Sequence, residues 1–196
     1  MTQLEIMGAN AKNASVFLRT AGSKKDDALL AIAKALREHS DEIIKANEID
    51  IENGKNAGLT ESLLDRLRLT PERINGMAEG VEQVAALADP IGNVLEGRTL
   101  KNGLNIEKVR VPMGVIGIIF EARPNVTSDA AALCLKAGSA VILRGGKEAI
   151  NSNLAVSEIM RNAVESVGFP KDCIALVKDT SRQSATELMQ LSDYLD

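Results

Sequence analysis

The sequence contains very few aromatic residues. Of its 196 residues only 2% are aromatic, with three Phe, one Tyr and no Trp. A hydrophobic core must therefore be aliphatic, and a hydrophobic fraction of 45% is enough to build one. This composition favours helices stacked on a buried sheet, an α/β fold, over a β-sandwich.

Cysteine and histidine are also scarce. Cys134 and Cys173 lie far apart without a C-x-x-C motif, and His39 has no partner at a metal-binding spacing. We therefore expect reduced thiols and no metal. Cys134 falls in an apolar helical segment and Cys173 at the start of an apolar run, where cysteines are most often buried and unreactive. His39 suits an exposed position at a helix end.

The sequence has no long basic or apolar run. The net charge is −4 and the pI is about 5.2, so nucleic acid and anionic membranes are improbable partners. Residues 1–19 are too polar for a signal peptide or membrane anchor, so we expect a cytoplasmic protein. The G-x-G-x-x-G and Walker A motifs are both absent.

Residues 2–89 have the apolar spacing of helices, with residues three or four apart sharing a face. Breaks are predicted at Gly22-Ser23, across residues 53–58, and at Thr70-Pro71. Thr70 can cap a helix that Pro71 opens. Three or four helices are expected.

A change to strand-like sequence follows Pro90. Residues 93–100 and 104–111 flank Lys101-Asn102-Gly103, and Asn-Gly favours a type I′ hairpin turn. A two-stranded ribbon is only marginally stable alone, so we expect it to pair with another sheet or subunit.

After Pro112, short apolar runs alternate with helical segments, which indicates βαβ units and a parallel sheet. The final residues, 188–196, lead from a helix toward a further strand, so we expect the sheet to be incomplete within this sequence. The predicted strands are 115–120, 140–143 and 174–177, and the predicted helices are 128–136, 151–166 and 181–191.

Polar residues follow the first strand of this predicted sheet, at the edge where parallel sheets bind ligands. Residues 121–129 include Arg123 and Asn125, followed by a helix that Thr127 or Ser128 can cap. The free N–H groups of such a helix favour an anion or a developing negative charge. An ordinary capped loop is the alternative interpretation.

The second predicted strand is followed by Arg144, Gly145, Gly146 and Lys147. Glycine lets a backbone approach a ligand closely, and Arg matches phosphate oxygens with two parallel hydrogen bonds. The pattern indicates a phosphate-binding loop, with a solvated turn as the alternative.

The runs 110–127, 133–138 and 141–148 closely resemble the glutamate-5-semialdehyde dehydrogenase family. Residues 110–117 also match the R-x-P-x-G-V-x-G entry shared by the wider aldehyde dehydrogenase superfamily, whose members lack the usual glycine fingerprint. The resemblance covers essentially the whole chain. It extends to residues 58–61, 64–67, 69–73 and 87–92.

This resemblance implies NADPH-dependent reduction of L-glutamate 5-phosphate to the semialdehyde, with release of phosphate, in proline biosynthesis. In the family a cysteine thiolate attacks the acyl phosphate, and the resulting thioester accepts a hydride. Neither Cys134 nor Cys173 matches that cysteine, and a glycine-rich loop is expected just beyond Asp196. We therefore expect an N-terminal part of such an enzyme, inactive alone.

The resemblance also implies roles for single residues. Asn125 is the candidate oxyanion-stabilising amide, and Arg123 is the candidate for a substrate carboxylate or phosphate. Arg144 would favour NADP by pairing with its 2′-phosphate, with Gly145, Gly146 and Lys147 completing that pocket.

The implied domain organisation is a helical region, 1–92, packed on a cofactor domain. It is followed by an oligomerisation hairpin, 93–111, and by the first half of a Rossmann-like NADP-binding domain of aldehyde dehydrogenase type, 112–196. A homo-oligomer is expected through the hairpin.

Two other functions compete with this interpretation. One is a non-catalytic short form that binds a nucleotide or a protein partner. The other is an acylating aldehyde dehydrogenase with a different substrate, which the run 121–125 disfavours because it looks specific to the glutamyl phosphate enzymes.

Overall fold

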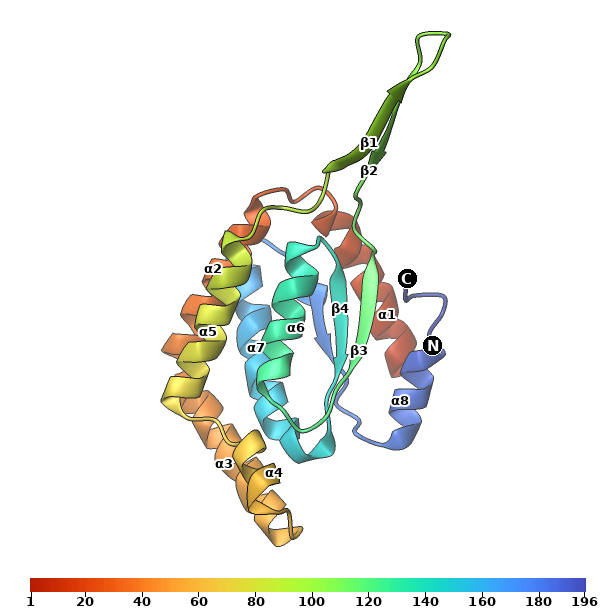
Figure 1. Ribbon diagram of the computed structural model, residues 1–196. Helices are drawn as coiled ribbons and strands as arrows, with labels where there is room; N and C mark the ends of the chain where they lie inside the picture. Colours follow the sequence, from red (N-terminus) through yellow and green to blue (C-terminus); the bar gives the residue numbers. More distant parts are fainter.

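The computed structural model describes all residues, 1–196, as a mixed α/β body with a projecting hairpin (Figure 1). Five helices come first: α1 Gln3–Leu18, α2 Lys24–Glu38, α3 Ser40–Asn56, α4 Glu61–Leu67 and α5 Pro71–Ala86. The hairpin strands are β1 Val94–Thr99 and β2 Asn105–Val109. The remaining elements are β3 Val115–Ile119, α6 Asn125–Lys136, β4 Ala140–Arg144, η1 Lys147–Ala149, α7 Ile150–Ser166, η2 Lys171–Cys173, β5 Ile174–Leu176 and α8 Arg182–Met189.

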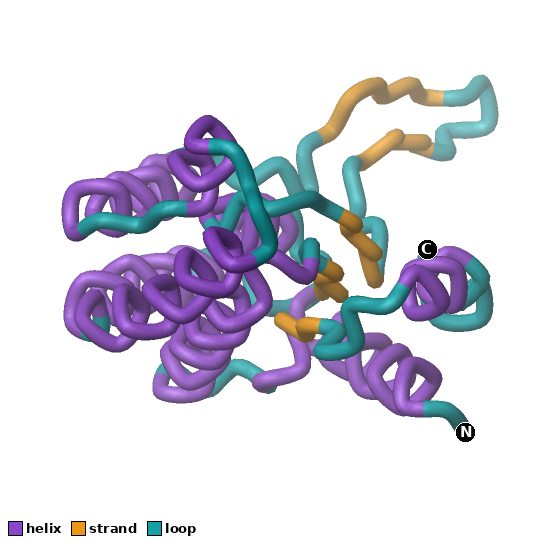
Figure 2. Tube along the Cα trace, turned by 90° about the horizontal axis from the view of Figure 1, so that it is seen from below, coloured by secondary structure: helices purple, strands orange, loops and turns teal.

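The predicted parallel sheet is confirmed. Its strand order is β3-β4-β5, and both pairs are parallel. Helices α1 and α8 lie on one side of the sheet and α6 and α7 on the other, as the view along the strands shows (Figure 2). Helices α2, α3 and α5 form a further layer over α6 and α7. The sheet is therefore covered on both faces, as a parallel sheet requires.

One hydrophobic core joins these layers. A single cluster of 40 buried residues runs from the N-terminal helices into the sheet. Phe17 of α1 meets Phe169, before β5, with ring centroids 5.2 Å apart in an edge-to-face arrangement. The rest of the core is aliphatic, as the composition predicts. No helix is long and apolar enough to span a bilayer.

The helical region contains five helices rather than three or four. The additional break is at His39, which has φ −104° and ψ 21° and separates α2 from α3. The predicted break at residues 53–58 begins later, because α3 continues to Asn56. A Cβ on Gly54 would lie 3.0 Å from the Leu59 side chain and 3.1 Å from that of Leu64, so this glycine permits close packing. The cap at Thr70 and Pro71 is confirmed.

The hairpin is confirmed, but its predicted type I′ turn is wrong. That turn needs positive φ at two successive residues, whereas only Gly103, with φ 85°, has positive φ here. The Gly103 amide donates to the Leu100 carbonyl and the Leu100 amide to the Leu104 carbonyl. This is a three-residue loop closed by a left-handed glycine. All eleven strand residues of the hairpin are exposed.

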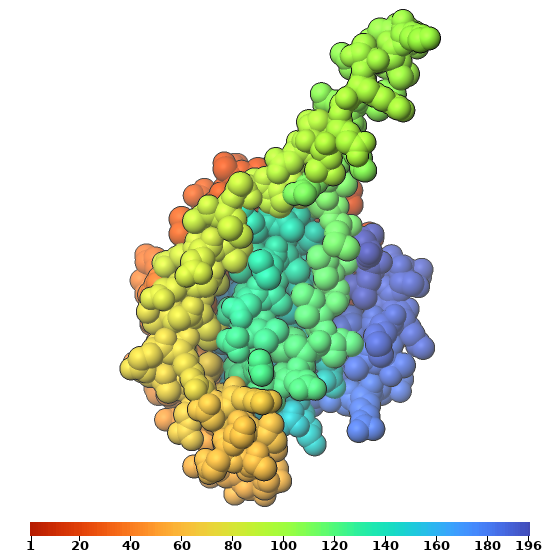
Figure 3. All heavy atoms as spheres, in the orientation of Figure 1, coloured from red at the N-terminus to blue at the C-terminus, as the bar shows by residue number.

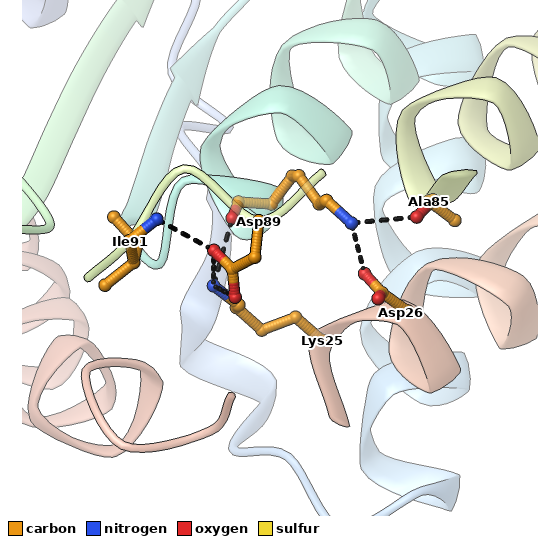
Figure 4. A network of polar contacts seen from close by, with 6 residues as sticks. Lys25, Asp26, Ala85, Asp89 and Ile91 are labelled. Atoms are coloured by element: carbon orange, nitrogen blue, oxygen red, sulfur yellow. Dashed lines mark hydrogen bonds and ion pairs between the residues drawn. The ribbon is translucent and has the colours of Figure 1, made fainter. Parts of the chain in front are cut away.

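A buried charge network lies near the hairpin base, where α5 and α6 end (Figure 4). The Lys25 ammonium, 2% exposed, donates to Asp89 at 2.9 Å and to the Lys136 carbonyl at 3.1 Å. The Lys136 ammonium, 4% exposed, donates to Asp26 at 2.6 Å and to the Ala85 carbonyl at 2.8 Å. These contacts connect α2, α5 and α6 at the amino end of the sheet.

Candidate functional site

The carboxyl ends of β3, β4 and β5 lie at the opposite edge of the sheet, the lower edge in Figure 1. Because the strands are parallel, the loops that follow them gather there, and ligands bind at such edges. The polar residues predicted after β3 and β4 are both on this edge.

Helix α6 begins at Asn125, three residues earlier than predicted, and the predicted cap at Thr127 or Ser128 is wrong. Pro124 precedes the helix without a side-chain cap. The Thr127 hydroxyl donates to Asn153 Oδ1 at 3.0 Å, and the Ser128 hydroxyl donates to the Asn125 carbonyl at 2.9 Å. The Thr127 hydroxyl therefore links α6 to α7, and the Ser128 hydroxyl bonds within α6.

The amide of Asn125 is bonded within its own helix. Its Nδ2 donates to Asp129 Oδ2 at 2.9 Å, one helical turn further on. Burial raises the pKa of the Asp129 carboxyl above its usual value, and this hydrogen bond offsets part of the rise. No cation forms an ion pair with Asp129.

A cleft of about 400 Å³ opens beside these residues. It lies between the α4–α5 segment and the β3–α6 segment, which are neighbours on the face shown in Figure 3. Arg123 and Asn125, both predicted site residues, line it together. The remaining lining residues are Asp65, Arg66, Arg68, Leu69, Arg73, Gly76, Met77 and Asp129.

Three arginines of the helical region contribute to this cleft, and sequence reasoning missed them. Arg73 binds the carbonyls of Asp65 and Arg68 and the Asp65 carboxylate at 2.9 Å, so it fastens α4 to α5. The guanidinium groups of Arg66 and Arg68 have no hydrogen-bond or ion-pair partner. Their signal in the sequence is the concentration of arginine around the predicted helix break at Thr70.

Arg144, at the end of β4, joins two loops of the carboxyl edge. One terminal nitrogen donates to the carbonyls of Thr180 at 2.5 Å and Ser181 at 2.7 Å, and the other donates to the Gly145 carbonyl at 3.2 Å. Its Nε is buried without a partner.

Gly145 and Gly146 are buried against the chain itself. A Cβ on Gly145 would lie 2.2 Å from Asn153 Nδ2 and 3.0 Å from the Phe120 ring. A Cβ on Gly146 would lie 3.3 Å from the Ala122 nitrogen. These glycines thus let the β3 and β4 loops touch. Lys147 is exposed and lines a separate hollow of about 330 Å³ beside α3.

Neither cysteine lies at this edge in reactive form. Both are buried free thiols, as predicted. Burial raises the pKa of Cys134 to about 11 and that of Cys173 to about 12. A nucleophilic cysteine needs a lowered pKa, so both thiols are unsuited to that role.

The covered parallel sheet, its polar carboxyl edge and the projecting hairpin place the chain in a known class. It belongs to the aldehyde dehydrogenase family, whose model matches residues 2–194.

Within that family the chain is similar to gamma-glutamyl phosphate reductases. It is 52% identical over 197 residues to the gamma-glutamyl phosphate reductase of Clostridium beijerinckii, an alignment that covers 100% of this chain and 48% of the relative. The crystal structure of the Thermotoga maritima gamma-glutamyl phosphate reductase superposes with a TM-score of 0.97 at 39% identity, over 99% of this chain and 47% of that one. The Saccharomyces cerevisiae enzyme gives 0.92 at 33% identity, over 100% and 50%. The chain thus spans about half the length of these relatives.

Proposed function

We propose that this chain is the N-terminal part of a reductase that converts L-glutamate 5-phosphate to L-glutamate 5-semialdehyde and phosphate, with NADPH as the reductant. The observation that carries the proposal is the 52% identity with a gamma-glutamyl phosphate reductase across the whole chain. The reaction belongs to proline biosynthesis, and a cytoplasmic location is part of the proposal.

The β3–α6 loop is the proposed contact with the substrate. Arg123 lines the cleft with an unpaired guanidinium group and suits a carboxylate or phosphate. Asn125 retains one N–H beyond its bond to Asp129, which is available to an oxyanion.

The β4 loop is the proposed contact with the cofactor. The positive charge of Arg144 at the end of β4 and the exposed ammonium of Lys147 suit an anionic group such as a 2′-phosphate. Gly145 and Gly146 contribute by keeping the β3 and β4 loops in contact. The bound cofactor would supply the hydride, while these residues would set its position and its preference for NADP.

The proposed organisation has three parts: residues 1–92, the hairpin 93–111, and residues 112–196 as the first half of the cofactor domain. The hairpin exposes Val94, Leu104 and Ile106 at 54%, 56% and 39%, which suits pairing with a second copy. Ile106→Asp is expected to weaken assembly in sedimentation experiments, whereas Thr99→Asp serves as the matched control.

The activity can be tested in the direction of NADP reduction. Protein expressed from the complete reading frame that contains residues 1–196 is assayed with glutamate semialdehyde, phosphate and NADP. We expect phosphate-dependent formation of NADPH, and no turnover by the 196-residue polypeptide alone because neither of its thiols is a suitable nucleophile.

Two substitutions test the proposed roles of single residues in this assay. Arg123→Gln is expected to raise the KM for the semialdehyde, and Arg144→Gln to reduce the preference for NADP over NAD by about tenfold. Turnover by the 196-residue polypeptide, or a complete protein that acts only on acyl phosphates without an amino group, would contradict the proposal.

A further inference from the structure

The cleft between α4–α5 and α6 is lined by several arginines that form no ion pair within the protein. Six charged residues line it: Asp65, Arg66, Arg68, Arg73, Arg123 and Asp129. Asp65 and Arg73 pair with each other at 2.9 Å. Three guanidinium groups and one carboxyl remain without an ion-pair partner, which leaves a formal charge of about +2 in one concave site.

Asp129 is the unusual member of this set. Its carboxyl is about half buried yet has no ion pair, and its hydrogen-bond donor is the neutral amide of Asn125. Removing a carboxylate from water without pairing it is unfavourable. An ammonium group entering the cleft would therefore gain a partly desolvated counter-ion.

The rest of the lining leaves room for a small molecule. Leu69 and Met77 are buried in the core cluster and form its apolar floor. Gly76 faces open space, since a Cβ there would meet no atom within 4 Å. A volume of about 400 Å³ is within the range of small-molecule sites.

We propose that this cleft binds the substrate as a phosphorylated amino acid, with Arg66, Arg68 and Arg123 holding its carboxylate and phosphate and Asp129 holding its ammonium group. The inference rests on the proposed function and adds three residues to it: Arg66, Arg68 and Asp129. A phosphate dianion, a carboxylate and an ammonium sum to a charge of about −2, opposite to that of the cleft. Substrate selection would thus depend on the helical region as well as on the β3–α6 loop.

A cofactor pyrophosphate fits this cleft less well. It has no cationic group for Asp129, whose carboxylate would repel it. Lys147, the free cation of the β4 loop, lines a different hollow. The unpaired arginines of the cleft and Lys147 therefore lie in separate hollows and suit two different ligands.

Calorimetric titration of the 196-residue protein tests the proposal with stable probes. L-2-amino-6-phosphonohexanoate carries the three charged groups at the substrate's spacing, and 6-phosphonohexanoate lacks only the ammonium. We expect the amino probe to bind about tenfold more tightly than its deaminated analogue, and inorganic phosphate to bind more weakly than both.

Single substitutions test which charged residue of the cleft binds which group of the probe. Arg66→Gln and Arg68→Gln should each weaken both probes about tenfold, whereas Asp129→Asn should remove the preference for the amino probe. Gly76→Leu should block both probes without altering any charge. Arg98→Gln, exposed on the hairpin, is the matched control and should bind like the parent.

Three outcomes would overturn the inference: no binding of the amino probe to the parent protein, equal affinity for the two phosphonates, or unchanged affinity in both arginine variants. Thermal unfolding of each variant identifies any loss that reflects misfolding. The proposed function fails separately, if the complete protein does not reduce L-glutamate 5-phosphate while probe binding follows the expected pattern.

Discussion

Buried charged side chains are paired at the amino end of the parallel sheet, whereas arginine side chains at its carboxyl end have no partner. At the amino end, Lys25 and Lys136 are almost fully buried, and each is bonded to a carboxylate and a backbone carbonyl. At the carboxyl end, Arg66, Arg68 and Arg123 line a cleft without partners. Buried charges that are paired hold elements together, whereas a group of unpaired charges in a concave site is available to a ligand.

The difference identifies which end can change without loss of the fold. The paired network joins α2, α5 and α6, so substitutions there should act on stability. The unpaired cations contact no acid of the protein, so their substitution should act on binding. Four predictions test this contrast, in order of decreasing effect.

Asp26→Ala should give the largest effect. It leaves the Lys136 ammonium, 4% exposed, with only the Ala85 carbonyl as partner. Removing one partner of a fully buried ion pair costs about 3–5 kcal/mol, and because the Asp26 side chain is 35% exposed we expect a loss of about 3 kcal/mol, measured by urea unfolding. Asp27→Ala, exposed in the same first turn of α2, should change stability by less than about 1 kcal/mol. Equal effects of the two substitutions would mean that the network does not hold the helices together.

Thiol alkylation should be slow at the amino end, where Cys134 and Cys173 lie. With pKa values of about 11 and about 12, their thiolate fraction at pH 8 is at least about 100-fold below that of an ordinary cysteine. Mass spectrometry after iodoacetamide treatment measures the rate, and urea-unfolded protein provides the reference. Rapid labelling of the folded protein would contradict the burial of these thiols.

Gly145→Ala should destabilise the carboxyl end by about 1–3 kcal/mol, because its methyl group would overlap Asn153 and press on Phe120. Gly76→Ala is the matched control within the cleft. Its methyl group enters open space in α5, where alanine is the better helix former, and stability should rise by up to about 1 kcal/mol. Opposite signs in thermal unfolding are expected, and destabilisation by both would refute this assignment.

Asp129→Asn should have the smallest effect on stability, and it should be favourable. Burial raises the pKa of folded Asp129, so folding is penalised while the carboxyl is ionised, above that raised pKa, and the penalty disappears as the pH falls below the unfolded value. The variant should therefore be more stable at neutral pH by less than about 1 kcal/mol, given the partial exposure of the group. Urea unfolding at pH 7 and pH 4 should show a clearly larger gain at pH 7 than at pH 4.

Much of the fold could be predicted because local patterns and tertiary structure agree. The apolar runs predicted the bounds of all three parallel strands to within one residue, and Thr70 with Pro71 marked the start of α5. In two places where prediction failed, a tertiary contact decided the outcome. Gly54 reads as a helix break but allows α3 to pack on the segment that returns beside it, and Thr127 reads as a cap but bonds Asn153.

The candidate site was predictable only where it follows a strand. Arg123 and Asn125 come directly after β3, so the rule for parallel sheets located them. Arg66 and Arg68 meet Arg123 only because α5 packs beside α6, and no local pattern encodes that contact. Asp129 belongs to α6 itself, one turn after Asn125. Conversely, the Gly145-Gly146 pair suggested a ligand contact, whereas its nearest neighbours are residues of the chain itself.

The packing of α1 on the sheet has a consequence for synthesis of the protein. Leu4, Ala11 and Leu18 belong to α1, which is synthesised well before β4, yet α1 packs against β4, whose residues are 140–144. At about 5–20 residues per second, the ribosome needs roughly 6 to 24 seconds to make the chain between them. During that interval the apolar face of α1 has no sheet to cover it. The apolar face of α1 therefore needs some other cover in the nascent chain, and α1 can reach its final place only after β4 has been made.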